Sequence, residues 1–286
     1  MDLTPAYLEL SVDDFVDCIE DNRNKFNKEH NTDYDEKEYQ AIRHQVFSDV
    51  LVSLNGQELG YWTPPCKIPL LPNYSGNDII RLVPCARTPH TSLTTRQYHF
   101  LKAIEQSFDM RKEEKCSFSN PKFEYVESIS FPILETFETS TTFLPVDTAD
   151  KKGIEIFHNG EKYVGKISLD NSYNFFNIAT KYFRLEGNGV RHFWEMYYKC
   201  ENGAMTTYLS YQYTPSGITH QDMIVLPATK SWKKVYIDLT EVVSWASGYA
   251  GSVSVRLGIR GNLNSGTETA NFYFDHVKLI SMTAHY

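Results

Sequence analysis

Residues 132–286 carry the pattern that most constrains the fold, because short runs of strand-forming residues follow one another with no long helical segment between them. We count nine runs separated by Gly, Asn, Ser or Pro turns: GIEIFHNG, YVGKISL, FFNIATKYFRL, VRHFWEMYYKC, TTYLSYQYT, DMIVLPA, WKKVYIDL, SVSVRLGIR and NFYFDHVKLI. Parallel strands need crossover connections that are usually helical, so this order excludes a doubly wound α/β fold. It predicts an all-β domain of two facing sheets, a jelly roll.

Residues 1–131 predict a second, smaller β-sandwich. Its clearest sign is the stretch DVLVSLNGQELGYW, in which Asn55-Gly56 joins two strand-like runs and favours a tight hairpin turn. Residues 11–48 differ, because they are dense in Asp, Glu, Asn and Lys. Helical spacing of Val12, Phe15, Val16 and Ile19 suggests one amphipathic helix, and residues 35–47 suggest another. The alternative, which we favour from sequence, is a solvated insertion.

Composition excludes several classes of function. The formal net charge is −8, and no cluster of Lys or Arg suits the binding of phosphates, so nucleic acid is not an expected partner. No apolar run reaches the roughly 18–20 residues that span a bilayer. The first residues, MDLTPAYLEL, do not read as a secretion signal.

The five cysteines are scattered along the chain at positions 18, 66, 85, 116 and 200. None forms a Cys-x-x-Cys pair, which argues against zinc and against a thioredoxin-like site. Buried free thiols are the interpretation that we favour, and a disulfide near the N-terminus is the alternative.

No catalytic motif emerges, and we expect a protein that is not an enzyme. The carboxylate pairs Glu135 with Glu138 and Glu195 with Asp238 have the residue types of a glycosidase, but nothing in the sequence fixes their separation. YAGSVS lacks the setting of a nucleophile elbow. The histidines at 192, 220 and 276 show no spacing typical of metal ligands.

A binding face is the stronger hypothesis. Strand alternation places Arg256 and Arg260 on one side of SVSVRLGIRGN, on either side of a glycine that leaves room for a planar ligand or an extended chain. The same rule groups Glu195 with Tyr197 and turns Trp194 and Met196 to the opposite face, which we expect to be core. Tyr211 adds an aromatic ring from TTYLSYQYT. If their strands are neighbours, the two arginines, Glu195, Tyr197 and Tyr211 suit a sugar, whose ring has an apolar C–H side and hydroxyls. The alternative is a solvated, salt-bridged face in which Glu195 offsets Arg256.

Several segments resemble known proteins. NGQELGYWTPPCKIPLL followed by NDIIRLVPCA resembles the N-terminal, Ig-like unit of Bacteroidetes cell-envelope lipoproteins of unassigned activity. The segments LETFET, FWEMYYKCENG, SWKKVYIDLTEVV and NFYFDHVKLI are similar to jelly rolls of carbohydrate-binding modules and galactose-binding-like domains. The resemblance implies a cell-envelope or cell-surface location, with a lipid anchor on a cysteine of the full-length precursor. It also implies glycan binding.

The resemblance further implies a structural calcium ion, for which Glu138 and Asp275 would supply oxygen ligands. His276 departs from the Asn or Asp that these modules often carry after the aspartate, which weakens the metal prediction. No cofactor is otherwise expected. Two alternatives to a glycan-binding protein stay open: a structural or interaction subunit that contacts other envelope proteins, and a glycan-active enzyme.

Overall fold

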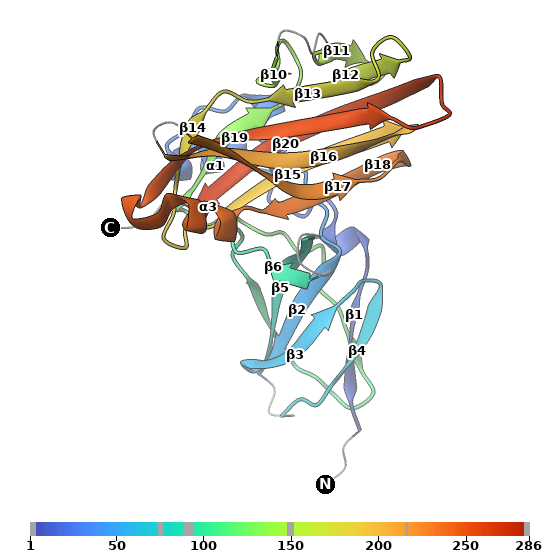
Figure 1. Ribbon diagram of the computed structural model, residues 1–286. Helices are drawn as coiled ribbons and strands as arrows, with labels where there is room; N and C mark the ends of the chain where they lie inside the picture. The colour runs from blue at the N-terminus through green and yellow to red at the C-terminus, as the bar shows by residue number, and fades with distance from the viewer. Residues whose placement is uncertain (1–3, 74–76, 89–93, 148–151, 215–216, 283–286) are drawn as a thin grey trace. The chain divides into compact units, whose positions relative to one another are not determined.

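The structure is a computed structural model that describes residues 4–73, 77–88, 94–147, 152–214 and 217–282 (Figure 1). Contacts divide the chain into two compact units. Unit 1 comprises residues 1–88 with 93–129, and unit 2 comprises residues 89–92 with 130–286. Strands dominate both units, which confirms the all-β prediction.

Unit 1 contains two sheets. In one, β1 pairs with β4 antiparallel and with β8 in parallel; in the other the order is β3-β2-β5-β6, and β7 also pairs with β5. The strands are β1 (Ala6–Leu10), β2 (Asp49–Leu54), β3 (Gln57–Trp62), β4 (Cys66–Leu70), β5 (Asp78–Thr88), β6 (Thr94–Gln97), β7 (Ile104–Phe108) and β8 (Lys115–Cys116). The helices are η1 (Asp13–Phe15), α1 (Arg23–His30) and α2 (Glu36–Arg43).

The predicted hairpin turn joins β2 to β3. Asn55 and Gly56 have φ values of +52° and +80°, and Leu54 pairs with Gln57 across the turn. Positive φ at both central residues is the geometry that Asn-Gly favours. The Asn55 side chain also donates to Asp78 (2.7 Å) and accepts from the Ile79 backbone (2.8 Å). The turn therefore has a structural role in unit 1, since it joins β2 to β3 and is hydrogen-bonded to β5.

The insertion at residues 11–48 contains a helix, α2, within the predicted range 35–47, but otherwise it matches neither interpretation. It is not a solvated segment, because it buries several large apolar side chains: Phe15, Ile19, Phe26, Tyr39, Ile42 and Phe47. The residues with helical spacing before Asp21 form a short 3₁₀ turn and then extended bridges, Val16 with Val46 and Ile19 with Phe123. Helix α2 is shorter than predicted and begins at a capping box formed by Asp35 and Glu38.

Unit 2 is built from two facing sheets, which we call the β15 sheet and the β16 sheet. The β15 sheet has the order β11-β12-β20-β15-β18, and β9 also pairs with β20. Its strands are β9 (Ile129–Glu135), β11 (Glu155–His158), β12 (Tyr163–Asp170), β15 (His192–Glu201), β18 (Thr229–Asp238) and β20 (Thr269–Met282).

The β16 sheet has the order β10-β13-β19-β16-β17, and β14 also pairs with β19. Its strands are β10 (Leu144–Pro145), β13 (Phe175–Ala179), β14 (Phe183–Glu186), β16 (Gly203–Thr214), β17 (Gly217–Leu226) and β19 (Ser252–Leu263). Helices α3 (Thr240–Ser247) and η3 (Gly248–Ala250) lie between β18 and β19 in the chain.

The core of unit 2 lies between the two sheets. The β15 sheet contributes Trp194 and Met196, and the β16 sheet contributes Val255 and Leu257, all within one buried cluster. These inward residues of β15 and β19 are the ones that strand alternation predicts. The residues that alternate with them point to the two outer faces of the sandwich.

Candidate functional site

The structure places the five predicted binding residues in separate locations. Glu195 and Tyr197 lie on β15, whereas Arg256 and Arg260 lie on β19, which belongs to the other sheet. All four alternate with core residues of their own strand, so the two pairs point away from opposite sides of the sandwich. The expectation of one shared face, with Glu195 offsetting Arg256, was therefore wrong. Ligand binding by each pair stays a prediction.

Tyr211 belongs to the core. It is 2% exposed, and its ring lies 6.0 Å from that of Trp245. On β16 it pairs with Val255 and alternates in phase with Leu209, another core residue. A ligand on the outer face of the sheet cannot reach this ring, which corrects the prediction.

Glu195 is a buried counter-ion. Its side chain is fully buried, and its Oε2 lies 3.4 Å from Lys234 Nζ and 3.6 Å from Lys278 Nζ. The pKa of Lys278 is lowered to about 7, chiefly by burial and also by repulsion from Lys234, while Glu195 acts in the opposite direction. Tyr197 lies beside the same charges, with Lys234 Nζ 4.6 Å from its ring centroid. We call Glu195, Lys234 and Lys278 the ionic end of the β15 sheet.

The outer face of the β16 sheet carries a different group of residues. Arg256 on β19 pairs across the strands with Ser210 on β16, and Ser210 pairs with His220 on β17. Ser210 Oγ lies 2.8 Å from His220 Nδ1. Tyr182 adds an aromatic ring, because the Arg256 guanidinium carbon lies 5.1 Å from its centroid. We call Tyr182, Tyr208, Ser210, His220 and Arg256 the Arg256 face.

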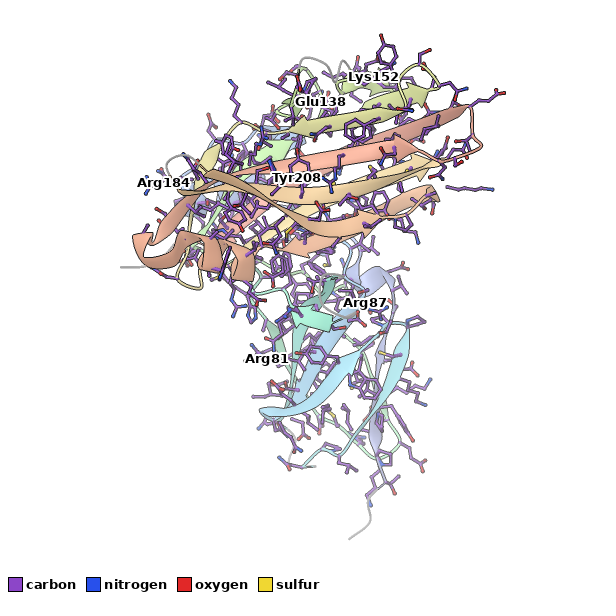
Figure 2. The ribbon with its side chains drawn as sticks, in the orientation of Figure 1. Arg81, Arg87, Glu138, Lys152, Arg184 and Tyr208 are labelled. Carbon is purple, nitrogen blue, oxygen red and sulfur yellow. The ribbon has the colours of Figure 1, made fainter. Side chains whose placement is uncertain are left out.

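Tyr208, labelled in Figure 2, forms the floor of this face because it packs on the backbone of β19. Its ring covers Gly258, where a Cβ atom would lie only 2.0 Å from Tyr208 Cζ. The Tyr208 hydroxyl donates to Asn177 Oδ1 at 2.7 Å, and burial raises the pKa of this hydroxyl. The room that we predicted beside Gly258 is therefore filled by the protein's own ring. The neighbouring Arg260 donates to Asp222 Oδ2 at 2.5 Å, so its charge is already paired.

Arg256 is the group on this face with unused binding capacity. Among the residues that the structure describes, its guanidinium makes no hydrogen bond and no ion pair, and its Nε is buried. Its partner Tyr182 is 39% exposed. A guanidinium offers five fixed donors and no acceptor, so it suits a ligand with hydroxyl or carboxylate oxygens.

Sequence reasoning missed Tyr182, Tyr208, Ser210 and His220. The signal for Tyr208 and Ser210 was available, because Leu209 is an obvious core residue and alternation then turns its two neighbours outward. Tyr182 lies on a connection between strands, and His220 is brought to the face by the pairing of β16 with β17. No local pattern predicts either position.

The predicted calcium ligand Asp275 has partners within the protein. Asp275 is buried and pairs with the ammonium of Lys162, and its Oδ1 also accepts from the His276 backbone at 2.8 Å. A lysine thus supplies the positive charge that a calcium ion would bring. Within the described ranges, no three His, Cys, Asp or Glu side chains cluster as metal ligands. Calcium bound by Glu138 and Asp275 stays a prediction.

The suspected catalytic groups have structural contacts. The buried Glu135 carboxylate accepts from the Phe137 and Thr142 backbone amides at 2.9 and 2.6 Å. The His192 ring lies 2.8 Å from Ser281 Oγ and 2.7 Å from the Glu186 carbonyl, and burial lowers its pKa. The five cysteines are free thiols, and burial raises the pKa of Cys18 to about 12.

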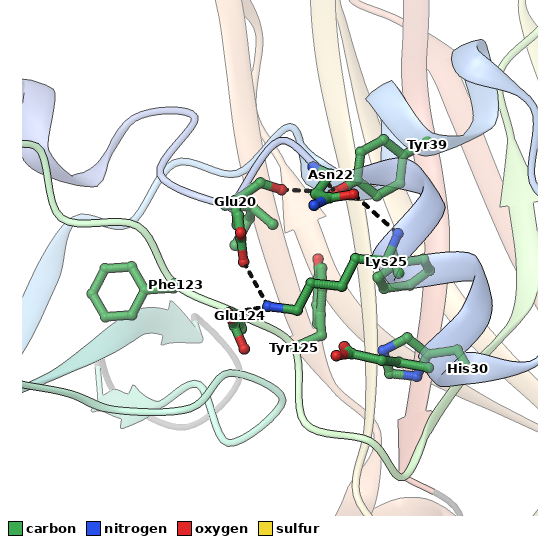
Figure 3. A pocket seen from close by; sticks show the side chains of 11 residues that line it. Glu20, Asn22, Lys25, His30, Tyr39, Phe123, Glu124 and Tyr125 are labelled. Carbon is green, nitrogen blue, oxygen red and sulfur yellow. Dashed lines mark hydrogen bonds and ion pairs between the residues drawn. The ribbon is translucent and has the colours of Figure 1, made fainter.

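Unit 1 has a small hollow below helix α1 (Figure 3). Lys25 crosses it and pairs with Glu20 at 3.1 Å and Glu124 at 2.5 Å. The hydrogen bond from Lys25 is the main cause that lowers the pKa of Glu124 to about 2. The cavity of about 20 Å³ is far smaller than the roughly 300–1,000 Å³ of pockets that bind small molecules. Its ion pairs connect helix α1 to the segments that carry Glu20 and Glu124, and it is too small for a ligand.

Comparison with known proteins gives structural likeness alone. No family model matches the chain, and no curated protein matches it. The N-terminal modules of a Clostridium thermocellum endo-1,4-β-D-xylanase, complexed with xylohexaose, are similar at 12% identity and TM-score 0.39, over 55% of this chain and 29% of that one. The C-terminal family 22 carbohydrate-binding module of the Clostridium thermocellum xylanase has 11% identity and a TM-score of 0.37, over 54% of this chain and 93% of that one.

A third solved structure is the family 11 carbohydrate-binding module of a Clostridium thermocellum cellulosomal cellulase. It has 12% identity and a TM-score of 0.36, over 55% of this chain and 98% of that one. None of the helices in the described ranges is long and apolar enough to cross a membrane.

Proposed function

We propose that unit 2 binds a glycan on the Arg256 face, without chemistry of its own. The observation that carries the proposal is the guanidinium of Arg256, a forked donor with no acceptor among the described residues, seated over the exposed ring of Tyr182. A sugar suits both groups, because its hydroxyls accept hydrogen bonds from the guanidinium and its C–H side packs on the aromatic ring.

The supporting residues give this face rigidity. Tyr208 is held by Asn177 and covers Gly258, and Ser210 is held by His220. Fixed polar groups lose little conformational entropy when a ligand binds, which favours affinity. The resemblance to envelope lipoproteins adds the proposal that the protein works at the cell envelope or cell surface.

The test begins with a glycan array probed with the full chain, followed by calorimetry on the oligosaccharide that binds best. Arg256→Ala should weaken binding by about 10- to 100-fold, because hydrogen bonds to a charged group contribute about 1.5–3 kcal/mol. Tyr182→Ala should weaken it by about tenfold through loss of the stacking surface.

Arg81→Ala is the matched control, since Arg81 is a half-buried arginine of unit 1 that pairs with Glu105 at 3.4 Å. It should bind the oligosaccharide like the parent protein. Absence of binding to every glycan on the array would count against the proposal, and so would an Arg256→Ala variant that binds as tightly as Arg81→Ala.

A further inference from the structure

The outer face of the β15 sheet carries a row of alternating aromatic and lysine side chains, one from each of five strands. From edge to edge these are Phe157 on β11, Lys166 on β12, Tyr273 on β20, Lys199 on β15 and Trp232 on β18. Lys166 and Lys199 both pair directly with Tyr273 across the strands. We call these five residues the aromatic–lysine row.

The rings form a continuous line. The centroids of Phe157 and Trp232 each lie 6.4 Å from that of Tyr273. The two outer rings remain open to solvent, at 39% and 37% exposure. Three aromatic rings in line present an extended apolar platform rather than one stacking position.

The lysines place positive charge between the rings. Lys166 Nζ lies 4.6 Å from the Phe157 centroid and 5.7 Å from that of Tyr273, and Lys199 Nζ lies 5.3 Å from Tyr273. Lys199 is paired with Glu201 at 2.6 Å. Lys166 makes no ion pair in the described part of the chain, although Glu155 is its direct cross-strand partner.

A hollow lies where β15 ends and β18 begins. It is lined in part by Glu201, Asn202, Thr229 and Lys230. The exposed Lys230 adds a further positive charge there. The hollow therefore adds polar side chains and a positive charge next to the β15 and β18 residues of the row.

We propose that the aromatic–lysine row is a second binding surface of unit 2, which takes a linear glycan bearing carboxylate groups. The sugar rings would pack on Phe157, Tyr273 and Trp232, and the carboxylates would contact Lys166 and Lys199. Charge selects this ligand, because the unpaired Lys166 lies within the platform of a protein whose net charge is −8. The inference does not depend on the proposed function, since the Arg256 face lies on the other sheet.

The experiment measures binding of the full chain to homogalacturonan in two forms, de-esterified and fully methyl-esterified, with alginate as a second acidic polymer. The parent protein should bind both acidic polymers and bind the methyl ester at least tenfold more weakly. Trp232→Ala should weaken acidic binding at least tenfold. Lys166→Gln should weaken it about threefold to tenfold and reduce its dependence on salt concentration.

Two matched controls accompany these variants. Trp245→Ala removes a tryptophan that is 62% exposed but lies on α3, outside the row. Lys67→Gln removes a lysine that lies 4.0 Å above the ring of Tyr7 in unit 1. Both should bind like the parent protein. Melting temperatures within a few degrees of the parent value would show that the test variants stay folded.

Three outcomes would overturn the inference: no binding to either acidic polymer, equal binding of the two homogalacturonan forms, or parent-like binding by both Trp232→Ala and Lys166→Gln. The variant Arg256→Ala separates this site from the other face. It should keep its affinity for the acidic polymers; loss of that affinity would assign the acidic glycan to the Arg256 face and refute the second surface.

Discussion

The two outer faces of unit 2 arise from the same strand alternation but differ in what they expose. On the β16 sheet, Tyr208 and Ser210 point outward and yet are buried. Arg260 and His220 lie against the Tyr208 ring, and His220 is hydrogen-bonded to Ser210. On the β15 sheet, Glu195 and Lys278 also point outward and are buried, whereas Trp232 and Phe157 further along stay open.

This comparison shows that an outward position is not the same as an accessible one. Alternation decides which way a side chain leaves the sheet. Accessibility depends on the length and direction of the side chains on neighbouring strands, and those strands come from distant parts of the sequence.

The largest expected effect concerns the ionic end of the β15 sheet. Glu195→Gln removes the carboxylate between Lys234 and Lys278 and leaves two buried amines without a counter-charge. At pH 6 we expect a loss of about 3–5 kcal/mol in the free energy of unfolding, as for other broken buried ion pairs. Urea unfolding followed by tryptophan fluorescence measures it.

Glu201→Gln is the matched control on the same strand. Glu201 pairs with Lys199 in a more exposed position, where an ion pair contributes at most about 1 kcal/mol. If the two variants lost equal stability, the ionic end of the face would be no more dependent on its charges than the solvated end.

A smaller effect is expected at the floor of the Arg256 face. In Gly258→Ala the new methyl group would lie within 2.0 Å of Tyr208 Cζ, so the ring must move away. We expect a loss of about 1–3 kcal/mol, typical of overpacking. The double variant Gly258→Ala with Tyr208→Ala should lose less stability than the two single losses added together, because the clash is gone.

The control is Gly153→Ala, since its Cβ would meet Pro145 at an ordinary 3.4 Å. It should change the free energy of unfolding by less than about 0.5 kcal/mol. Additive effects of the Gly258 and Tyr208 substitutions would mean that the ring does not rest on the glycine in solution.

The positions of the strands could be predicted from the sequence better than the order in which the strands pair within the sheets. Alternation correctly assigned Trp194 and Met196 to the core and Arg256 to an outer face. It could not reveal that β15 and β19 belong to different sheets, because strand order is set by long-range pairing. Tyr211 was misassigned for a local reason: it was grouped by its aromatic character instead of by its phase with Leu209.

The aromatic–lysine row shows the same limit more sharply. Each of its five strands contributes one residue, so no segment of the sequence contains a motif. The Arg256 face is partly local, since Arg256 and Gly258 lie on one strand, but Tyr208 fills the space over the glycine from another. Faces of this kind become visible once register is known.

The smallest effect is a pH dependence that separates the ionic end of the β15 sheet from the rest of the molecule. The pKa of Lys278 is lowered to about 7 in the folded protein, below its value near 10.5 when unfolded. Between these values the unfolded chain binds more protons, so the free energy of unfolding rises with pH. We expect the parent protein to gain up to about 1.4 kcal/mol per pH unit from pH 7 to 8.5.

The range ends at pH 8.5 because the buried thiols act in the opposite direction at higher pH. Burial raises the pKa of Cys85 to about 12, so the unfolded chain loses its thiol protons first. Lys278→Met should flatten the rise, whereas Lys233→Met, at an exposed lysine of β18, should preserve it. An equal slope in all three proteins would mean that Lys278 is not held at a lowered pKa, and the ionic end of the face would then be hydrated like the aromatic end.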